Sequence, residues 1–324
     1  MILLTGIAGF IAMHTAQHLL DNGNQVLGID NLNNYYDPIL KQARLNVLMS
    51  HSNKPEFLQL DLAEPKALQT AITPFAGEIT HIIHLAAQAG VRYSLESPRS
   101  YVSANISGML EVLECCRVLP NLRHLVYASS SSVYGANRKL PFCSTDRTDH
   151  PVSLYAATKK SGEVIAESYS RLYGIPMTGL RFFTVYGPWG RPDMAYYQFA
   201  RNIVEDKPIQ IYNYGNMRRD FTFIGDVVDG LVSVLYAPPS VDPPHRIYNL
   251  GNHHSESLSY LIELLEGYIG KLAIKEFVPI QKGDMQDTFA DISDAAHDFG
   301  FAPKTSLKEG LKVFVDWFHL YYYL

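Results

Sequence analysis

The chain has 324 residues, of which 47% are hydrophobic and 18% are charged, and its formal net charge is −5. This length can bury a large core in one big domain or in two closely joined ones. The negative charge argues against a general nucleic-acid-binding protein. The three cysteines, Cys115, Cys116 and Cys143, lack metal-ligand spacing, so we expect no metal site and a reducing compartment.

No apolar stretch reaches the ~18 residues that would span a bilayer. The first predicted strand starts too close to residue 1 to leave room for a signal peptide. We therefore expect a cytoplasmic protein that does not associate with membranes, unless an N-terminal anchor has been removed.

The chain opens with an apolar run at residues 2–4, which is typical of a strand buried on both faces of a parallel sheet. Gly6 and Gly9 follow it and predict a tight turn before a helix over about 10–20. A diphosphate is favoured at such a turn, because the backbone can approach closely and the helix N-terminus attracts negative charge. For the glycines alone, a plain turn is the alternative.

A second strand, predicted over 25–29, ends at Asp30. Its distance from the glycines suits a carboxylate that accepts hydrogen bonds from the adenosine ribose. No arginine follows Asp30 closely, so a 2′-phosphate would be repelled without compensation. The order of strand, turn, helix, strand and acid therefore predicts NAD rather than NADP, and makes a plain turn the weaker alternative.

Further strands are predicted over 56–60, 81–85 and 124–128, and helices near 65–72, 98–118 and 153–173. This alternation predicts an α/β fold with a doubly wound parallel sheet of the Rossmann type. After about residue 180, prolines and glycines recur, which indicates a smaller mixed α/β lobe that binds substrate. We assign 1–181 to the NAD-binding domain, with 220–250 returning to it, and 182–219 and 251–324 to the substrate-binding lobe.

Tyr155 and Lys159 are four residues apart, which places both on one face of the helix predicted over 153–173. A nearby ammonium favours the phenolate, so Tyr155 could act as a base near neutral pH. With 21 tyrosines in the chain, such a pair should arise by chance about once. Its weight therefore depends on the glycines and on the serine run 129–132, for which a polar loop at a strand end is the alternative.

Four motifs together resemble the extended short-chain dehydrogenase/reductase superfamily, and within it the NAD-dependent nucleotide-sugar epimerases and dehydratases. They are Thr-Gly-x-x-Gly-Phe-x-Ala at 5–12, His-Leu-Ala-Ala-Gln at 84–88, Ser-Ser-Ser-Ser-Val-Tyr-Gly at 129–135, and Tyr-x-x-x-Lys at 155–159. The stretches 30–37, 89–94 and 181–194 are similar to those of UDP-glucuronate 4-epimerases. Ala12 departs from the more usual glycine, and Ile224-Gly225-Asp226 stands where an extra aspartate is common.

The resemblance implies a reaction in which hydride leaves C4 of a UDP-sugar for NAD, and the planar 4-keto sugar is reduced from its other face. Tyr155 would take the proton of the 4-hydroxyl group and later return it. Lys159 would lower the pKa of Tyr155 and hold the nicotinamide ribose. Ser130 would bind the reacting oxygen.

The resemblance also implies ligand contacts by position. Cofactor contacts would come from Gly6, Gly9, Phe10, Ile11, Asp30, Asn31, Asp61, Leu62, Leu85, Ala86, Ala87, Gln88, Asn105, Ser129, Tyr155, Lys159 and Phe182. Substrate contacts would come from Arg92, Ser130, Ser131, Ser132, Thr184, Arg191, Arg219 and Asp284. Alternatives stay open for three of them: a satisfied core amide for Asn105, a uridine contact for Arg191, and an exposed turn for Asp284.

The serine run decides the reaction type. Dehydratases and decarboxylases of this superfamily place an acidic residue there, whereas this chain has Ser131 and Ser132. We therefore expect a UDP-glucuronate 4-epimerase. The alternatives are a 4-epimerase of neutral UDP-sugars, a dehydratase or decarboxylase, and, more remotely, an NAD-binding regulator without turnover.

A homodimer is also expected. The predicted helices 98–118 and 153–173 carry apolar residues on more than one face, and relatives of this kind pair such helices across a two-fold axis.

Overall fold

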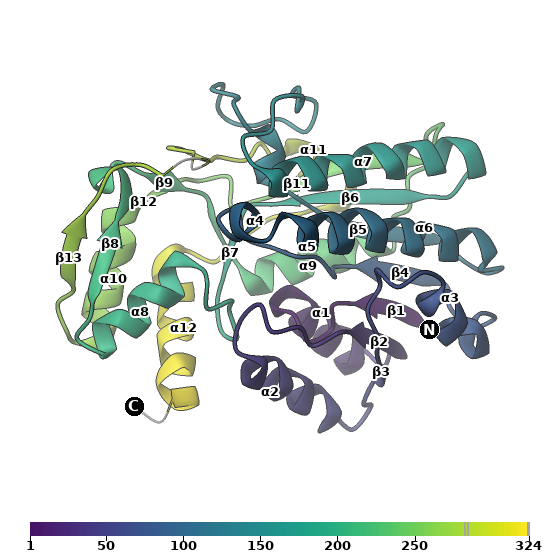
Figure 1. Ribbon diagram of the computed structural model, residues 1–324, viewed down its shortest axis with the longest axis horizontal. Coiled ribbons are helices and arrows are strands. Elements are labelled where there is room, and N and C mark those ends of the chain that lie inside the picture. The colour runs from purple at the N-terminus through teal and green to yellow at the C-terminus, as the bar shows by residue number, and fades with distance from the viewer. Residues whose placement is uncertain (282, 284, 323–324) are drawn as a thin grey trace.

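A seven-stranded parallel sheet forms the centre of the computed structural model, which describes residues 1–281, 283 and 285–322. The strands lie in the order β11-β6-β5-β4-β1-β2-β3, and every neighbouring pair is parallel. Their bounds are β1 (Ile2–Thr5), β2 (Val26–Asp30), β3 (Glu56–Gln59), β4 (His81–His84), β5 (His124–Ser130), β6 (Met177–Phe182) and β11 (His245–Leu250). The predicted doubly wound parallel sheet is confirmed (Figure 1).

Helices cover both faces of the sheet (Figure 1). One face carries α1 (Phe10–Asp21), α2 (Pro38–Met49) and α9 (Ile224–Leu235), and the other carries α3 (Ala67–Ile72), α6 (Gly108–Val118) and α7 (Leu154–Tyr173). Strand β1 shows why its sequence has no polar alternation. Ile2 and Leu4 point into the first core, while Leu3 points into the second, so every position is buried.

The helix predicted over 98–118 is interrupted. It consists of α5 (Pro98–Val102), a π-helical turn (Ser103–Ser107) and α6, preceded by the short α4 (Tyr93–Glu96). In a π turn the hydrogen bonds run from residue i to i+5, which a hydrophobic pattern of ordinary helical period does not reveal. Asn105 lies inside this widened turn.

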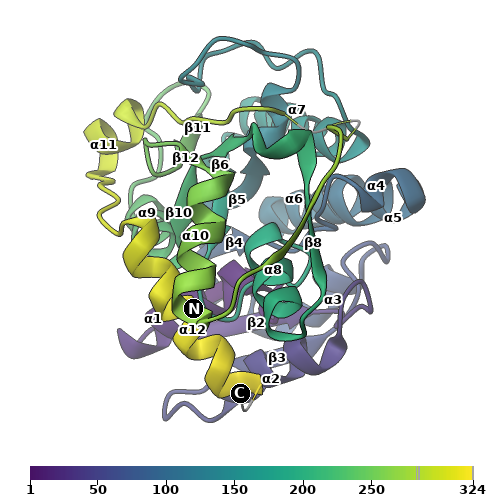
Figure 2. The same ribbon diagram turned by 90° about the vertical axis from the view of Figure 1, so that its left-hand side faces the viewer.

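A second group of elements packs beside the carboxyl ends of the strands (Figure 2). Its helices are α8 (Ala195–Val204), α10 (Leu258–Ile269) and α12 (Leu307–Tyr322), which share an aromatic core that includes Tyr196 and Phe314. Three two-stranded pairs accompany them: β7 (Thr184–Tyr186) with β10 (Phe221–Phe223), β8 (Pro208–Ile211) with β13 (Ile274–Phe277), and β9 (Arg218–Arg219) with β12 (Glu256–Ser257). The remaining elements are α11 (Ser293–Phe299) and 3₁₀ turns at Thr73–Phe75, Ser131–Tyr134 and Tyr212–Gly215.

The chain returns from this second group to the sheet. Helix α9 contacts α1, and β11 pairs with β6 at the edge of the sheet. The division of the chain at residue 181 stays a prediction. Among the helices that the structure describes, none is long and apolar enough to cross a bilayer.

Candidate active site

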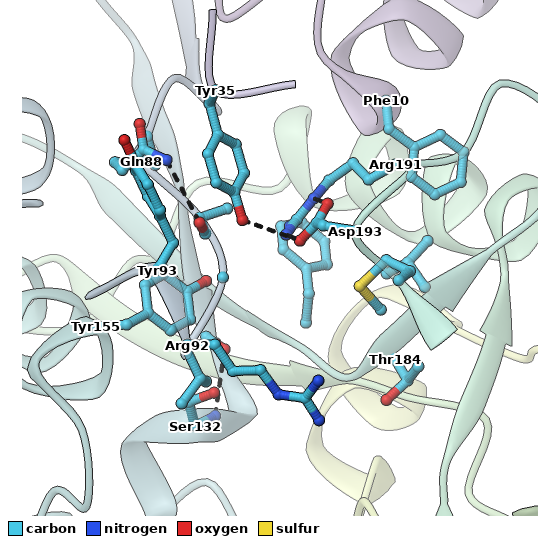
Figure 3. Close-up of a pocket in the computed structure, with 18 of the residues that line it drawn as sticks. Phe10, Tyr35, Gln88, Arg92, Tyr93, Ser132, Tyr155, Thr184, Arg191 and Asp193 are labelled. Carbon is cyan, nitrogen blue, oxygen red and sulfur yellow. Dashed lines mark hydrogen bonds and ion pairs between the residues drawn. The ribbon is translucent and has the colours of Figure 1, made fainter. Parts of the chain in front are cut away.

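A cavity of about 950 Å³ lies at the carboxyl ends of the central strands, a size in the range of small-molecule sites. Nearly every site residue predicted from the sequence lines it, including Gly6, Tyr155 and Arg219. Asn105 does not line it, and Asp284 lies outside the described residues. Figure 3 shows the part of the cavity around Tyr155, Arg92, Ser132, Thr184 and Arg191.

The glycine turn forms a close backbone cradle. Gly6 has a φ of +76°, and a Cβ atom there would lie 2.8 Å from the Ala86 nitrogen, while one on Gly9 would lie 2.8 Å from the Gly6 oxygen. Gly9 caps α1 without a side-chain hydrogen bond, so the first N–H groups of the helix are open to an anion. The turn therefore fits the diphosphate of a dinucleotide.

Asp30 stands at the end of β2, where a ribose hydroxyl would meet it. Its Oδ2 accepts a hydrogen bond from Ala8 N (3.0 Å), and its Oδ1 accepts one from Leu32 N (2.8 Å). Burial raises the pKa of Asp30, although these bonds and the charges of Lys41 and Arg44 oppose the shift. A carboxylate can accept further hydrogen bonds, so Asp30 can still bind ribose hydroxyls.

The two cations near Asp30 come from α2, and the sequence analysis missed both. Lys41 Nζ donates to the Asn33 carbonyl oxygen (2.6 Å) and Oδ1 (2.7 Å). Arg44 is fully buried and donates to backbone oxygens of Ala8, Trp189 and Gly190. Their donors are thus committed to neutral acceptors, which agrees with a site for NAD rather than for a 2′-phosphate.

The adenosine end of the cavity is closed by the segment after β3. Asp61 Oδ2 accepts a hydrogen bond from Asn31 Nδ2 (3.0 Å), and its Oδ1 accepts one from Ala63 N (2.9 Å). Leu62 lies next to this pair and lines the same wall. Asp61 and Leu62 thus line the cavity, and the cofactor contact that the resemblance implies for them stays a prediction.

Ser130 and Tyr155 meet at the other end of the cavity. Ser130 ends β5, and Tyr155 lies in the first turn of α7, whose N-terminus is fixed by Ser153 Oγ accepting from Ala156 N (3.1 Å). Burial raises the pKa of Tyr155 above its ordinary value of 10, while the Arg191 charge and a hydrogen bond from Ser130 act in the opposite direction.

Lys159 lies one turn beyond Tyr155, as predicted, but its charge is directed elsewhere. Its Nζ donates to the Ala128 carbonyl oxygen (3.0 Å), and burial, aided by repulsion from Arg191, lowers the pKa of Lys159 to about 8. Arg191 is a cation that lowers the pKa of Tyr155 in this structure, and the spacing of Tyr155 and Lys159 could not reveal it. The expectation that Lys159 also lowers the pKa of Tyr155 stays a prediction.

A buried ion pair between Glu163 and Arg181 holds in place the helix that carries Tyr155. Glu163 on α7 accepts hydrogen bonds from Ser129 Oγ (2.7 Å), Arg181 Nε (2.8 Å) and Arg181 Nη2 (2.9 Å). It therefore ties the helix that carries Tyr155 to the ends of β5 and β6. The sequence analysis missed it, although an arginine in the apolar strand β6 was a signal that a buried carboxylate should lie nearby.

Polar groups surround the cavity beyond Tyr155. Ser131 and Ser132 lie in the 3₁₀ turn after β5, and Thr184 begins β7. Arg191 forms a two-pronged ion pair with Asp193, with Nε to Oδ1 at 3.0 Å and Nη2 to Oδ2 at 2.5 Å. Asp193 belongs to a motif quoted above, but no role was assigned to it from the sequence.

Asn105 lies behind the cavity wall and positions Gln88. Its Oδ1 accepts from Gln88 N (2.7 Å), and its Nδ2 donates to the Gln88 carbonyl oxygen (3.0 Å) and to Thr158 Oγ1 (3.0 Å). The Asn105 amide is thus satisfied by neighbouring protein groups, which favours the alternative of a core amide. Its role as a cofactor contact stays a prediction.

These features define a class of protein. A glycine cradle before a helix, an acid at the end of the second strand, and a serine, tyrosine and lysine in the same cavity are the parts of a dinucleotide-dependent enzyme that moves a proton and a hydride.

Comparison with known proteins gives the family. Residues 2–251 match the model of the NAD dependent epimerase/dehydratase family, and the chain belongs to that family. It is 47% identical to UDP-glucuronate 4-epimerase 1 of Arabidopsis thaliana over 99% of this chain and 77% of the relative.

Solved structures agree with this assignment. A crystal structure of UDP-glucuronic acid 4-epimerase from Bacillus cereus, in complex with UDP-glucuronic acid and NAD, is 34% identical, with a TM-score of 0.89 over 99% of both chains. The UDP-glucose 4-epimerase of Thermotoga maritima, solved with UDP-glucose, is 28% identical, with a TM-score of 0.88 over 99% of both chains.

Proposed function

We propose that the protein is an NAD-dependent isomerase that interconverts UDP-glucuronate and UDP-galacturonate by inverting C4. One observation carries the proposal: Ser130, Tyr155 and Lys159 share a cavity with a dinucleotide cradle, while the turn after β5 presents hydroxyl groups and no carboxylate. The relatives named above as UDP-glucuronate 4-epimerases support the choice of substrate.

Each group of residues in the cavity has its own role in the proposed reaction. The glycine cradle, Asp30 and Asp61 would hold NAD, which would supply hydride-transfer chemistry at C4 of the sugar. Tyr155 accepts the proton of the 4-hydroxyl group, and the hydrogen bond from Ser130 stabilises the phenolate that forms. Lys159, whose pKa is about 8, remains charged at neutral pH and adds a positive charge one turn away.

A carboxylate in the cavity does not change the reaction type. Elimination of water would need a further acid or base near the sugar, and Asp193 lines the cavity. Burial alone would raise its pKa, but the charge and hydrogen bonds of Arg191 lower it overall. A carboxylate held in this way is a poor base, so epimerisation remains the preferred reaction over dehydration.

We predict that kcat/KM for UDP-glucose is lower than for UDP-glucuronate by about 10³-fold or more, because donors placed for the C6 carboxylate would be left unpaired. The hydroxyl groups of Ser131, Ser132 and Thr184 are the proposed donors. A product assay with UDP-glucuronate, UDP-glucose and UDP-N-acetylglucosamine tests this preference. Comparable rates on the first two, or release of carbon dioxide with a UDP-pentose, would contradict the proposal.

Thr184 offers a matched pair of variants for the same assay. Thr184→Val removes the hydroxyl group but keeps the shape, so it should reduce the preference for UDP-glucuronate. Thr184→Ser keeps the hydroxyl group and should retain the preference.

We also propose that the protein is a homodimer. Apolar side chains are exposed along α5, α6 and α7, which lie on the same face of the sheet; they include Val102, Leu110, Val118, Val164 and Leu172. Pairing this face with a second copy would bury it in a four-helix bundle.

Light scattering should give twice the mass of the 36.4 kDa chain at micromolar concentration. Leu110→Glu should yield monomers, since it would bury a charge in the interface. Leu272→Glu changes an exposed leucine outside these helices and should leave the dimer intact. A monomeric wild-type protein would refute the pairing.

A further inference from the structure

Tyr35, Asp193 and Arg191 form a hydrogen-bonded cluster across the cavity (Figure 3). The Tyr35 hydroxyl donates to Asp193 Oδ2 (3.2 Å), and Asp193 holds Arg191 by two bonds. Tyr35 comes from the loop between β2 and α2, whereas the other two come from the loop between β7 and α8. The cluster therefore joins the two sides of the cavity.

The geometry of the ion pair orients the guanidinium. Nε and Nη2 of Arg191 donate to the two carboxylate oxygens of Asp193. These two bonds fix the plane of the guanidinium, and Nη1 is the nitrogen that takes no part in them. Both side chains are three-quarters buried, with 24% of Arg191 and 25% of Asp193 exposed. Water competes weakly for such a pair, so its geometry persists.

Tyr35 is itself held in place. Its ring packs on Tyr93, with the ring centroids 4.8 Å apart. Gly90, with a φ of +95°, lies directly behind its hydroxyl group, where a Cβ atom would come 2.3 Å from the hydroxyl oxygen. The phenol thus fills a gap that only a glycine leaves open, and its hydroxyl group is aimed at Asp193.

The cluster acts on the reacting end of the cavity. The positive charge of Arg191 lowers the pKa of both Tyr155 and Lys159, and the negative charge of Asp193 raises that of Tyr155. Among the described residues, the Ser130 hydroxyl of β5 and Tyr101 of α5 also lie beside Tyr155, and Lys159 is one turn along the same helix. Arg191 lines the same part of the cavity as Tyr155 and Thr184 (Figure 3), which supports a position near the sugar rather than near the uracil base.

We propose that Asp193 and Tyr35 are positioning residues that act through Arg191. They hold the guanidinium at the reacting end of the cavity, turn its free nitrogen toward the sugar, and balance its charge. The inference rests on the proposed function, since it takes the ligand to be a nucleotide sugar. Tyr35 orients Asp193 by a hydrogen bond, and Asp193 in turn orients Arg191, which contacts the substrate.

Asp193→Asn tests the second link of this chain. We expect kcat/KM for UDP-glucuronate to fall by about 10- to 100-fold, because a misplaced binding group costs this much. The basic group seen in the pH profile of kcat/KM, assigned to Tyr155, should move to lower pH, since the Arg191 charge is then unopposed. A loss of activity with the pH profile unchanged would indicate a merely structural role and overturn the proposal.

Glu205→Gln is the matched control. It removes the same charge from Glu205, which follows α8 and pairs with Arg201 and Lys207 at the partly exposed surface, and it should leave kcat/KM and its pH profile unchanged. Calorimetric titration of the NAD-loaded protein adds a second readout. Asp193→Asn should weaken the binding of UDP-glucuronate but not the binding of UDP. Equal weakening of both affinities would contradict a role at the sugar.

Tyr35→Phe tests the first link through a double-mutant cycle. Alone, it should lower kcat/KM by about 3- to 10-fold, the value of one hydrogen bond. In the Asp193→Asn background it should cost nothing further, because the hydroxyl group acts only through the carboxylate. Losses that simply multiply would overturn the proposal.

The two proposals can fail separately. A wild-type protein that is inactive on UDP-glucuronate but active on another nucleotide sugar would refute the proposed function. The cycle would then be measured on that sugar.

Discussion

Tyr155→Phe is expected to lower kcat/KM for UDP-glucuronate by about 10²-fold or more, because it removes the group that accepts the 4-hydroxyl proton. The phenyl ring keeps the shape of the side chain, so the variant should fold and should bind NAD as the wild-type protein does. Steady-state kinetics and calorimetric titration with NAD measure the two effects. Wild-type turnover in this variant would refute the role of Tyr155.

Tyr101→Phe provides a control beside the same ring. Tyr101 packs edge-on against Tyr155, with the ring centroids 6.1 Å apart, but its hydroxyl group is shared between the carbonyl oxygens of Ala89 (2.7 Å) and Gly90 (2.5 Å). Losing this hydroxyl group should reduce kcat/KM by no more than about 10-fold. A loss equal to that of Tyr155→Phe would show that the tyrosines act only by shaping the cavity.

Glu163→Gln is expected to destabilise the fold by about 3–5 kcal/mol, because it leaves the Arg181 guanidinium buried without a negative partner. Only 3% of the Arg181 side chain and 1% of that of Glu163 are exposed. Urea unfolding measures the change in free energy. Asp316→Asn, which breaks an exposed pair with Lys312 on α12, should cost at most about 1 kcal/mol. Equal effects of the two changes would contradict the supporting role of Glu163.

The same pair predicts a pH dependence. Burial would raise the pKa of Glu163, but Arg181, Ser129 and Lys160 lower it below its ordinary value of 4.5. The contribution of the carboxylate to stability is therefore present above pH 4.5 and is lost as the pH falls through the lowered pKa. The difference in stability between the wild-type protein and Glu163→Gln should shrink across this acidic range.

The sheet and the cofactor end of the cavity could be predicted from the sequence, because their signals are local. Strand β1 is a continuous apolar run, Gly6 and Gly9 follow within a few residues, and Asp30 ends the next strand. Each signal depends on neighbours along the chain. Parallel strands then bring their ends to one edge without further information.

The contacts that set the electrostatics of the site were not predictable in this way. Tyr35 and Asp193 are 158 positions apart, and Arg44 and Trp189 are 145 positions apart. No periodicity or spacing connects such pairs. The effect of Arg191 on the pKa of Tyr155 was missed for the same reason: Lys159 is near Tyr155 in the sequence, whereas Arg191 is distant in the sequence and reaches it through space.

The π turn at Ser103–Ser107 limits how the chain can change in length. Such a turn contains one residue more than an ordinary helical turn and shifts the residues beyond it by about 100° around the axis. Asn105 therefore reaches Gln88 from inside the turn, while Leu110 and Val118 further along remain exposed. Losing a single residue here would turn either Asn105 away from Gln88 or the exposed side chains of Leu110 and Val118 away from the proposed dimer interface. Evolution can thus exchange side chains along this helix, but gains and losses of residues are expected only beyond its ends.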